Sequence, residues 1–133
     1  MTKFTDIHGI TFAPFAPAGS LSQDCARQSL RLMKERTNAD FIILVPGGLQ
    51  DTPQSENINY TSEYTMTDHE LRQFIGFAQS IGLRVALKPT VNCKNGTWRA
   101  HINFFDEAKV AQLVCFLYRV SEALCQDCAG DKL

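Results

Sequence analysis

The fold is decided by three stretches that share one kind of ending: Ile10-Thr11-Phe12-Ala13-Pro14, Ile42-Ile43-Leu44-Val45-Pro46 and Val85-Ala86-Leu87-Lys88-Pro89. Each is a short apolar or β-branched run closed by proline, and a helix-like segment follows each one. Such runs are typical of strands buried on both faces, and their alternation with helices predicts parallel βα units. We therefore predict an α/β fold: a partial (β/α)8 TIM barrel made of its first three βα units with parallel strands. A complete barrel needs roughly 250 residues, whereas this chain has 133.

The overall composition excludes several classes of protein. Hydrophobic residues make up 44% of the chain, charged residues 20%, and the net charge is -1. With no excess of basic residues, we expect neither a nucleic acid nor a membrane as partner. The sequence has no apolar run of about 18 residues and no signal peptide, so we expect a cytoplasmic location. The five cysteines lack the spacing of a disulfide framework, which predicts free thiols.

A first helix is expected between the first two strands. Ser20 and Gln23 have the spacing of a capping box, and Asn38 stands where a C-cap would end the helix after Thr37. An apolar stripe would bury one face of this helix, with two further apolar residues beside the stripe. The stripe consists of Ala26, Leu30 and Met33, and its neighbours are Cys25 and Leu32.

A second helix is expected before the third strand. Thr67 and Glu70 form another capping box, and Gly82 occupies the position of a C′ glycine. Its apolar stripe, with i, i+3, i+4 spacing, consists of Leu71, Phe74, Ile75, Ala78 and Ile81.

Two long polar segments, 46–66 and 88–103, follow the second and third predicted strands. Long segments without periodicity are uncommon as passive connections in a compact domain. The second one contains Asn95-Gly96, which predicts a tight turn. Because loops after strand ends build the active-site face of a parallel barrel, we expect both segments to face one cleft.

The second polar segment has the residue types of a sugar-binding surface. An aromatic ring stacks on the apolar face of a sugar, while amides, guanidinium and ammonium groups bond its hydroxyls. The candidate substrate-binding residues are Lys88, Asn92, Trp98, Arg99, His101 and Asn103. Two alternatives stay open here: Trp98 plugs a loop against the barrel rim, and His101 is structural and not a general base. No pair of carboxylates stands on the strand ends, so we name no catalytic residue.

A C-x-x-C pair, Cys125 and Cys128, lies near the end of the sequence. Such a pair is found in redox proteins and in zinc sites, but no second pair completes tetrahedral ligation here. A thioredoxin-like motif would also open a helix early in a βαβ unit. We therefore expect no metal site and no cofactor.

Three segments together resemble a known family: Gly9-Ile10-Thr11-Phe12, Leu87-Lys88-Pro89 and above all Asn95-Gly96-Thr97-Trp98-Arg99-Ala100-His101-Ile102-Asn103-Phe104-Phe105-Asp106. They are similar to glycoside hydrolase family 113, the β-mannanase-type (β/α)8 barrels, over about residues 7–106. The resemblance implies hydrolysis of β-linked mannosides with retention by two glutamates on later strands, beyond the matching part. It also implies that Lys88, Trp98 and Arg99 face sugar. One departure is Thr90, where many members carry histidine, and this leaves the substrate open.

The chain departs from the family pattern after Asp106. Translation one nucleotide later in each codon permits P-K-W and then F-A-F-Y-T-E-F-L-K-H-Y-A-R-I-A-Q-E, a helix with the family's pattern. Our hypothesis is therefore that the chain has two parts. Residues 1–106 are the N-terminal part of the barrel, and residues 107–133 are a frameshifted tail that ends at an early stop codon. The tail retains a helical stripe, made of Val110, Leu113, Val114, Leu117, Val120 and Leu124.

Two classes of function remain from the sequence. The first is a truncated glycoside-hydrolase-like chain that binds carbohydrate and is inactive alone. The alternative is a stand-alone small α/β module that binds a ligand or a partner through segment 46–66. Because three βα units leave sheet edges and one sheet face open, we also expect marginal stability and self-association through these edges.

Overall fold

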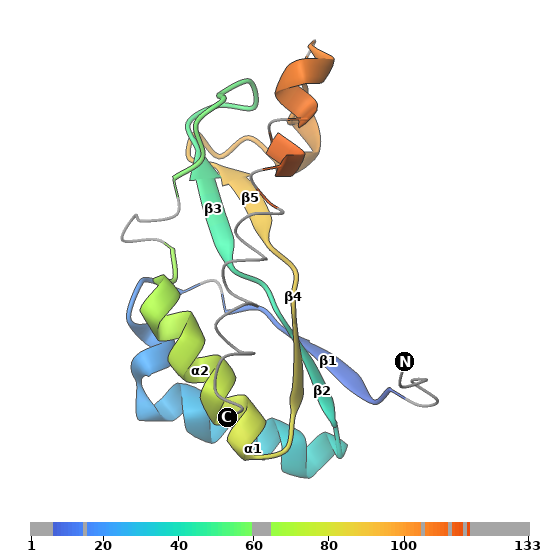
Figure 1. The fold of residues 1–133 in the computed structure, drawn as a ribbon. Coiled ribbons are helices and arrows are strands. Elements are labelled where there is room, and N and C mark those ends of the chain that lie inside the picture. The colour runs from blue at the N-terminus through green and yellow to red at the C-terminus, as the bar shows by residue number, and fades with distance from the viewer. Residues whose placement is uncertain are drawn as a thin grey trace, which may run out of the picture.

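The structure is a computed structural model, and it describes residues 7–14, 16–59, 65–104, 106–111, 113–115 and 117. Strands and helices alternate along this part of the chain (Figure 1). The longer helices are α1 (Asp24–Thr37) and α2 (Asp68–Ser80), and residues 107–111, 113–115 and 117 are also helical. The strands are β1 (Gly9–Phe12), β2 (Phe41–Leu44), β3 (Gly47–Gln50), β4 (Arg84–Leu87) and β5 (Thr90–Cys93). No helix in the described ranges is long and apolar enough to cross a membrane.

The strands form two parallel ladders, which confirms the predicted βα units. One sheet has the order β1-β2-β4, and β3 pairs with β5. Parallel neighbours need a crossover connection. Helix α1 lies in the connection between β1 and β2, and α2, after β3, lies in the connection between β2 and β4. Both helices lie on the same side of the three-stranded sheet (Figure 1). The third strand is followed by the helical residues near 107–117, as the sequence predicts.

Each long strand is interrupted at a proline and then continues. Val45-Pro46 separates β2 from β3, and Lys88-Pro89 separates β4 from β5. Proline has no N–H to donate to a ladder, so pairing breaks there. It resumes where the Thr90 N–H donates to the Pro46 carbonyl at 2.9 Å. The prediction that segments 46–66 and 88–103 are loops from their first residues is therefore wrong, because each begins with a strand.

The core lies between the two helices and the three-stranded sheet. Leu30 of α1, Phe74 of α2 and Ile42 of β2 are almost wholly buried in it. The Phe74 ring stacks on Phe12, with 5.4 Å between the ring centroids. Both predicted stripes pack here, but Cys25 and Leu32 face away from the core: Cys25 is exposed and Leu32 is 49% exposed.

The start of α1 differs from the prediction. The Ser20 hydroxyl donates to the Pro17 carbonyl at 2.7 Å and does not cap the helix. Residues Ser20–Ser22 form a short 3-10 turn (η1), and α1 begins at Asp24 with Gln23 as N-cap, without a side-chain cap bond. Local serine-to-backbone bonds compete with capping, so the Ser20–Gln23 spacing did not form a capping box.

The other predicted helix ends are confirmed. Thr67 Oγ1 accepts the Glu70 N–H at 3.2 Å, and Glu70 Oε2 accepts the Thr67 N–H at 3.4 Å, which completes a capping box on α2. Asn38 adopts φ of 51° at the C-cap of α1, and its N–H donates to Lys34. Gly82 follows α2 with φ of 79°, a left-handed conformation that glycine adopts without strain.

Candidate functional site

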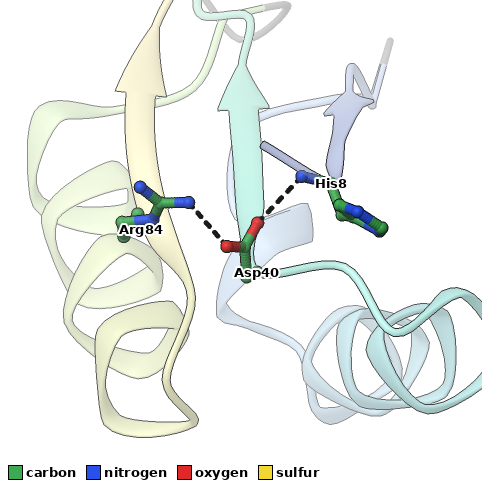
Figure 2. Close-up of polar contacts among 3 residues, drawn as sticks. All are labelled: His8, Asp40 and Arg84. Atoms are coloured by element: carbon green, nitrogen blue, oxygen red, sulfur yellow. Dashed lines mark hydrogen bonds and ion pairs between the residues drawn. The ribbon is translucent and has the colours of Figure 1, made fainter. Parts of the chain in front are cut away.

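One set of polar contacts joins the beginnings of three neighbouring strands (Figure 2). Asp40, just before β2, accepts the His8 N–H at 3.1 Å and the Arg84 Nη2–H at 2.6 Å. Partial desolvation raises the pKa of Asp40, but the Arg84 hydrogen bond and the His8 N–H together outweigh it, so the net pKa is lowered. This set of contacts connects β1, β2 and β4 at the amino ends of the strands. In parallel barrels, residues at that end serve stability, and the active site lies at the opposite end.

A cavity of about 240 Å³ lies at the opposite end, beside the strand carboxyl ends. The segment after β1 contributes Pro14, Ala16 and Pro17, and the segment before α2 contributes Thr65 and Met66. The strand side is formed by Val45, Gly47, Gly48, Leu49, Thr90 and Asn92. The cavity thus occupies the position where parallel barrels place their ligands.

Strand alternation accounts for the strand residues that line the cavity, except Gly48. Side chains two positions apart point to the same face of a strand. Val45, Gly47 and Leu49 have this spacing along β2 and β3, and Thr90 and Asn92 have it along β5. The register pairs Gly47 with Thr90 and Leu49 with Asn92, which places these residues side by side. Gly47 has no side chain, and no atom outside its chain neighbours lies within 4 Å of the place that its Cβ would take.

The buried carboxylate of Glu70 connects the two segments that close the cavity. Its Oε1 accepts the Leu21 N–H at 2.5 Å, and its Oε2 accepts the Gly19 N–H at 2.9 Å. The same Oε2 also accepts the Thr67 N–H of the capping box. Glu70 is only 2% exposed. The sequence indicated its capping role, but the contact with residues 49 and 51 positions earlier in the chain carried no sequence signal.

The residues above the cavity are held by side chains at the ends of β3 and β5. Lys94 pairs with Asp51 at 3.0 Å, and the buried Gln50 donates to the Cys93 sulfur at 3.7 Å. Asn59 returns to β3 and exchanges backbone hydrogen bonds with Leu49 at 2.7 and 2.9 Å. Segment 51–59 is therefore an ordered connection and not a free loop.

A second ion pair connects this segment to the helix near 107–117. Lys109 lies 2.5 Å from Glu56. The hydrogen bond that Lys109 donates to the Glu56 carboxylate, together with the negative charge of Glu56, raises the pKa of Lys109. The same helix begins where the Asp106 carboxylate accepts the Ala108 N–H at 2.9 Å, as expected for a helix start.

The six candidate sugar-binding residues do not gather at one point. Asn92 lines the cavity and is half-buried, and Lys88 lies exposed between β4 and β5. Trp98 precedes a 3-10 turn, η2 (Arg99–His101), whose Arg99 and His101 are both exposed. Asn103 is exposed just after that turn. Among the cavity-lining residues that the structure describes, Asn92 is thus the one candidate.

Trp98 presents its ring to solvent. Its side chain is 68% exposed, so its ring is not packed into the described part of the chain. The His101 ring lies edge-on to it, with 6.2 Å between the centroids. The preceding Asn95-Gly96 turn is confirmed, since Gly96 has φ of 78° and the Thr97 N–H donates to Asn95 Oδ1. This turn reverses the chain between β5 and the exposed Trp98.

The acidic side chains of the described part do not line the cavity. Asp40 lies at the far end of the strands, Glu70 is occupied by backbone donors, and Asp51 and Glu56 are paired with lysines. Retaining glycosidases need two carboxyl groups about 5–5.5 Å apart at the scissile bond. The described cavity is lined by polar and apolar residues and lacks such a pair of carboxyl groups.

Comparison with known protein families identifies the family of this chain. The model of the family described as Glycoside Hydrolase Family 113 matches residues 10–114. The chain belongs to glycoside hydrolase family 113. The match runs from Ile10 in β1 through β5, includes both helices and Trp98, and extends past residue 106 into the helix that follows. The predicted resemblance is therefore confirmed.

Solved structures of family 113 enzymes share the fold. Two structures of a "GH113 beta-1,4-mannanase", one of them a complex, are 48% identical to this chain with a TM-score of 0.72. The β-mannanase AaManA from Alicyclobacillus acidocaldarius, in complex with ManMIm, is 38% identical with a TM-score of 0.69. The first two are matched over 75% of this chain and AaManA over 76%, but the match spans 32% of each neighbour. The partial barrel fold is thereby confirmed. No curated protein sequence matches the chain.

Sequence reasoning missed several cavity residues of this family 113 chain. Gly47, Gly48 and Leu49 carried no strand signal, because glycine is depleted in strands. Thr90, Val91 and Asn92 alternate in polarity with a β-branched centre, a signal that would have found β5. Thr65 and Met66 approach the cavity through tertiary packing alone.

The remaining sequence predictions concern cysteines and the tail. Cys25, Cys93 and Cys115 are free thiols. Cys125, Cys128, Val120 and Leu124 lie outside the described residues. Among the residues of the stripe that are described, Val110, Leu113, Val114 and Leu117 are helical.

Proposed function

We propose that this chain forms one wall of the β-mannoside-binding cleft of a family 113 barrel. The observation that carries the proposal is the cavity at the strand carboxyl ends, with Asn92 on its wall and Trp98 exposed above β5. Family membership and the 48% identity to a β-1,4-mannanase support mannoside as the sugar. The substrate-binding set would be Asn92 and Trp98, extended by Lys88, Arg99, His101 and Asn103.

We further propose that the 133-residue chain on its own binds sugar without hydrolysing it. The described cavity wall lacks the pair of carboxylates that retention requires. A cavity of about 240 Å³ is also smaller than the roughly 300 Å³ lower bound of sites that bury a drug-sized ligand. We therefore expect the chain to bind mannoside weakly, because it would form only part of the binding site.

The test uses the chain's single tryptophan as a reporter. Binding of mannohexaose is followed by fluorescence of Trp98 and by calorimetry, with cellohexaose as the stereochemical control. We expect saturable binding of mannohexaose and no release of reducing ends. If the chain binds neither sugar, the proposal that it forms a sugar-binding cleft is refuted. Hydrolysis of mannohexaose would refute the proposal that the chain alone is inactive.

We also infer that the isolated chain associates with itself. β1 and β4 are the outer strands of the described three-stranded sheet, and unpaired parallel edges are sites of association. Sedimentation velocity over a range of protein concentrations tests this. A single monomeric species at all concentrations would contradict it.

The free thiols at Cys25, Cys93 and Cys115 fit a reducing compartment, and on that basis we infer a cytoplasmic location. Fractionation of cells that express the native gene would test this. Recovery of the chain outside the cytoplasm would overturn it.

A further inference from the structure

We propose that Glu70 is a positioning residue that shapes the sugar cavity by holding its two loop walls to the start of α2. The proposal rests on the proposed function, because it assumes that the cavity at the strand ends binds sugar. It assigns to Glu70 a role beyond helix capping.

The geometry brings three backbone donors from two segments onto one carboxylate. The Leu21 and Gly19 N–H groups come from the turn after β1, and the Thr67 N–H comes from the residue before α2. A carboxylate only accepts hydrogen bonds, and its two oxygens offer about four lone-pair sites. Glu70 is therefore matched to three converging N–H groups, and its 2% exposure excludes bulk water as a substitute.

Each held segment continues directly into the cavity wall. Pro17, two residues before Gly19, lines the cavity, and its carbonyl accepts both the Ser20 N–H at 3.2 Å and the Ser20 hydroxyl at 2.7 Å. The turn that Glu70 anchors therefore carries Pro17 with it. On the other side, Thr65 and Met66 line the cavity and immediately precede Thr67.

A change at Glu70 should move the cavity walls before it unfolds the core. In Glu70→Gln the side-chain volume stays nearly constant, but one acceptor oxygen becomes an NH2 group. That group faces a backbone N–H, and two donors cannot bond each other. An NH2 group in place of Oε1 would lose the Leu21 bond, and one in place of Oε2 would lose the Gly19 and Thr67 bonds. In either case the turn after β1 is held less tightly, while the core of Leu30, Ile42 and Phe74 keeps its contacts.

The experiment compares the full chain with Glu70→Gln and two controls. Glu35→Gln removes an exposed carboxylate from α1, and Ile75→Val removes one methyl from the core one turn after Glu70. Amide hydrogen exchange of Gly19 and Leu21 reports the tie directly, and the Kd for mannohexaose reports the cavity. We expect Glu70→Gln to speed exchange at one or both amides and to weaken binding, each by about tenfold.

The controls separate positioning from general stability. Ile75→Val should lower the thermal midpoint without changing Kd, and Glu35→Gln should change neither quantity. Unchanged exchange at Gly19 and Leu21 in Glu70→Gln would overturn the tie itself. Faster exchange with unchanged Kd would overturn its role in binding. Absence of mannohexaose binding by the unmodified chain would instead refute the proposed function, and with it the role in binding, while the exchange data would still decide the tie.

Discussion

Asp40 and Arg84 form a hydrogen-bonded ion pair across the beginnings of β2 and β4, with 2.6 Å between Oδ2 and Nη2. The same carboxylate accepts the His8 N–H, so a single side chain joins the starts of all three strands in the first sheet (Figure 2). The Arg84 guanidinium also lies over the Phe41 ring, 5.6 Å from its centroid. In a parallel sheet, where strands meet only after long crossovers, such a tie fixes register at one end.

The lowered pKa of Asp40 predicts a specific pH dependence of stability. A carboxyl whose pKa is lower in the folded state stabilises the fold above its ordinary value of 3.8 and loses that contribution as pH falls through the folded pKa. Asp40→Asn should therefore destabilise the chain near neutral pH, and its difference from the unmodified chain should shrink as the pH falls below 3.8. Urea unfolding at several pH values measures this. A difference that is constant with pH, or equal to that of Glu35→Gln, would contradict it.

The capping box of α2 predicts a moderate loss of stability in Thr67→Ala. The hydroxyl that accepts the Glu70 N–H at 3.2 Å is removed, and loss of an N-cap costs about 1 kcal/mol. Urea unfolding gives the free energy. Thr67→Ser keeps the acceptor and should retain most of that energy; equal losses in both variants would show that the hydroxyl is not the cause.

Phe74→Ala should cause the largest loss among single core changes considered for this chain. The ring is almost wholly buried and stacks on Phe12, and such truncations cost about 3–5 kcal/mol. If the chain lies near the lower end of the usual stability of about 5–15 kcal/mol, this variant should be close to unfolding at room temperature. Leu32→Ala, at a half-exposed position on α1, should change stability by at most about 0.5 kcal/mol. A loss below about 1 kcal/mol in Phe74→Ala would contradict the described core.

The exposure of Trp98 predicts a separation of binding from stability. Trp98→Ala should weaken mannohexaose binding about tenfold, because an exposed ring that stacks on sugar buries its face only when sugar is bound. Its thermal midpoint should stay close to that of the unmodified chain. Calorimetry replaces fluorescence for this variant, and Leu32→Ala is the matched control. Unchanged affinity would remove Trp98 from the proposed cleft.

The coding DNA tests the proposed boundary between residues 1–106 and 107–133. We predict that the frame one nucleotide later, from the codon of Phe104 onward, encodes an aromatic helix and continues into strand-end glutamates. Sequencing of that region past the stop codon is the measurement. Stop codons in the shifted frame would contradict the frameshift. Residues 107–133 would then be the genuine continuation of the protein.

Much of the fold could be predicted from local patterns. The β-branched runs before Pro14, Pro46 and Pro89 predicted the three parallel strands, and the Thr67–Glu70 spacing predicted the start of α2. These predictions succeeded because each depends on residues that are neighbours in the sequence. The Ser20–Gln23 box failed because a competing local bond to Pro17 was available to the same hydroxyl.

The candidate site was predicted less completely. Asn92 was identified by its residue type, and it lines the cavity, but the strand that carries it was taken for a loop. Gly47 and Gly48 have no strand propensity, so pairing with β5 is what holds them extended.

The sequence by itself determined the order of β1, α1, β2, α2 and β4, the parallel class of the sheet and membership of family 113. It could do so because hydrophobic period, caps and the segment around Trp98 are local signals. Tertiary structure alone decided where the cavity lies and what holds its walls. The bonds from Gly19 and Leu21 to Glu70 join residues about fifty positions apart. Such contacts arise only once the helices pack on the sheet, since a carboxylate gives up water for three backbone donors only where burial brings those donors together.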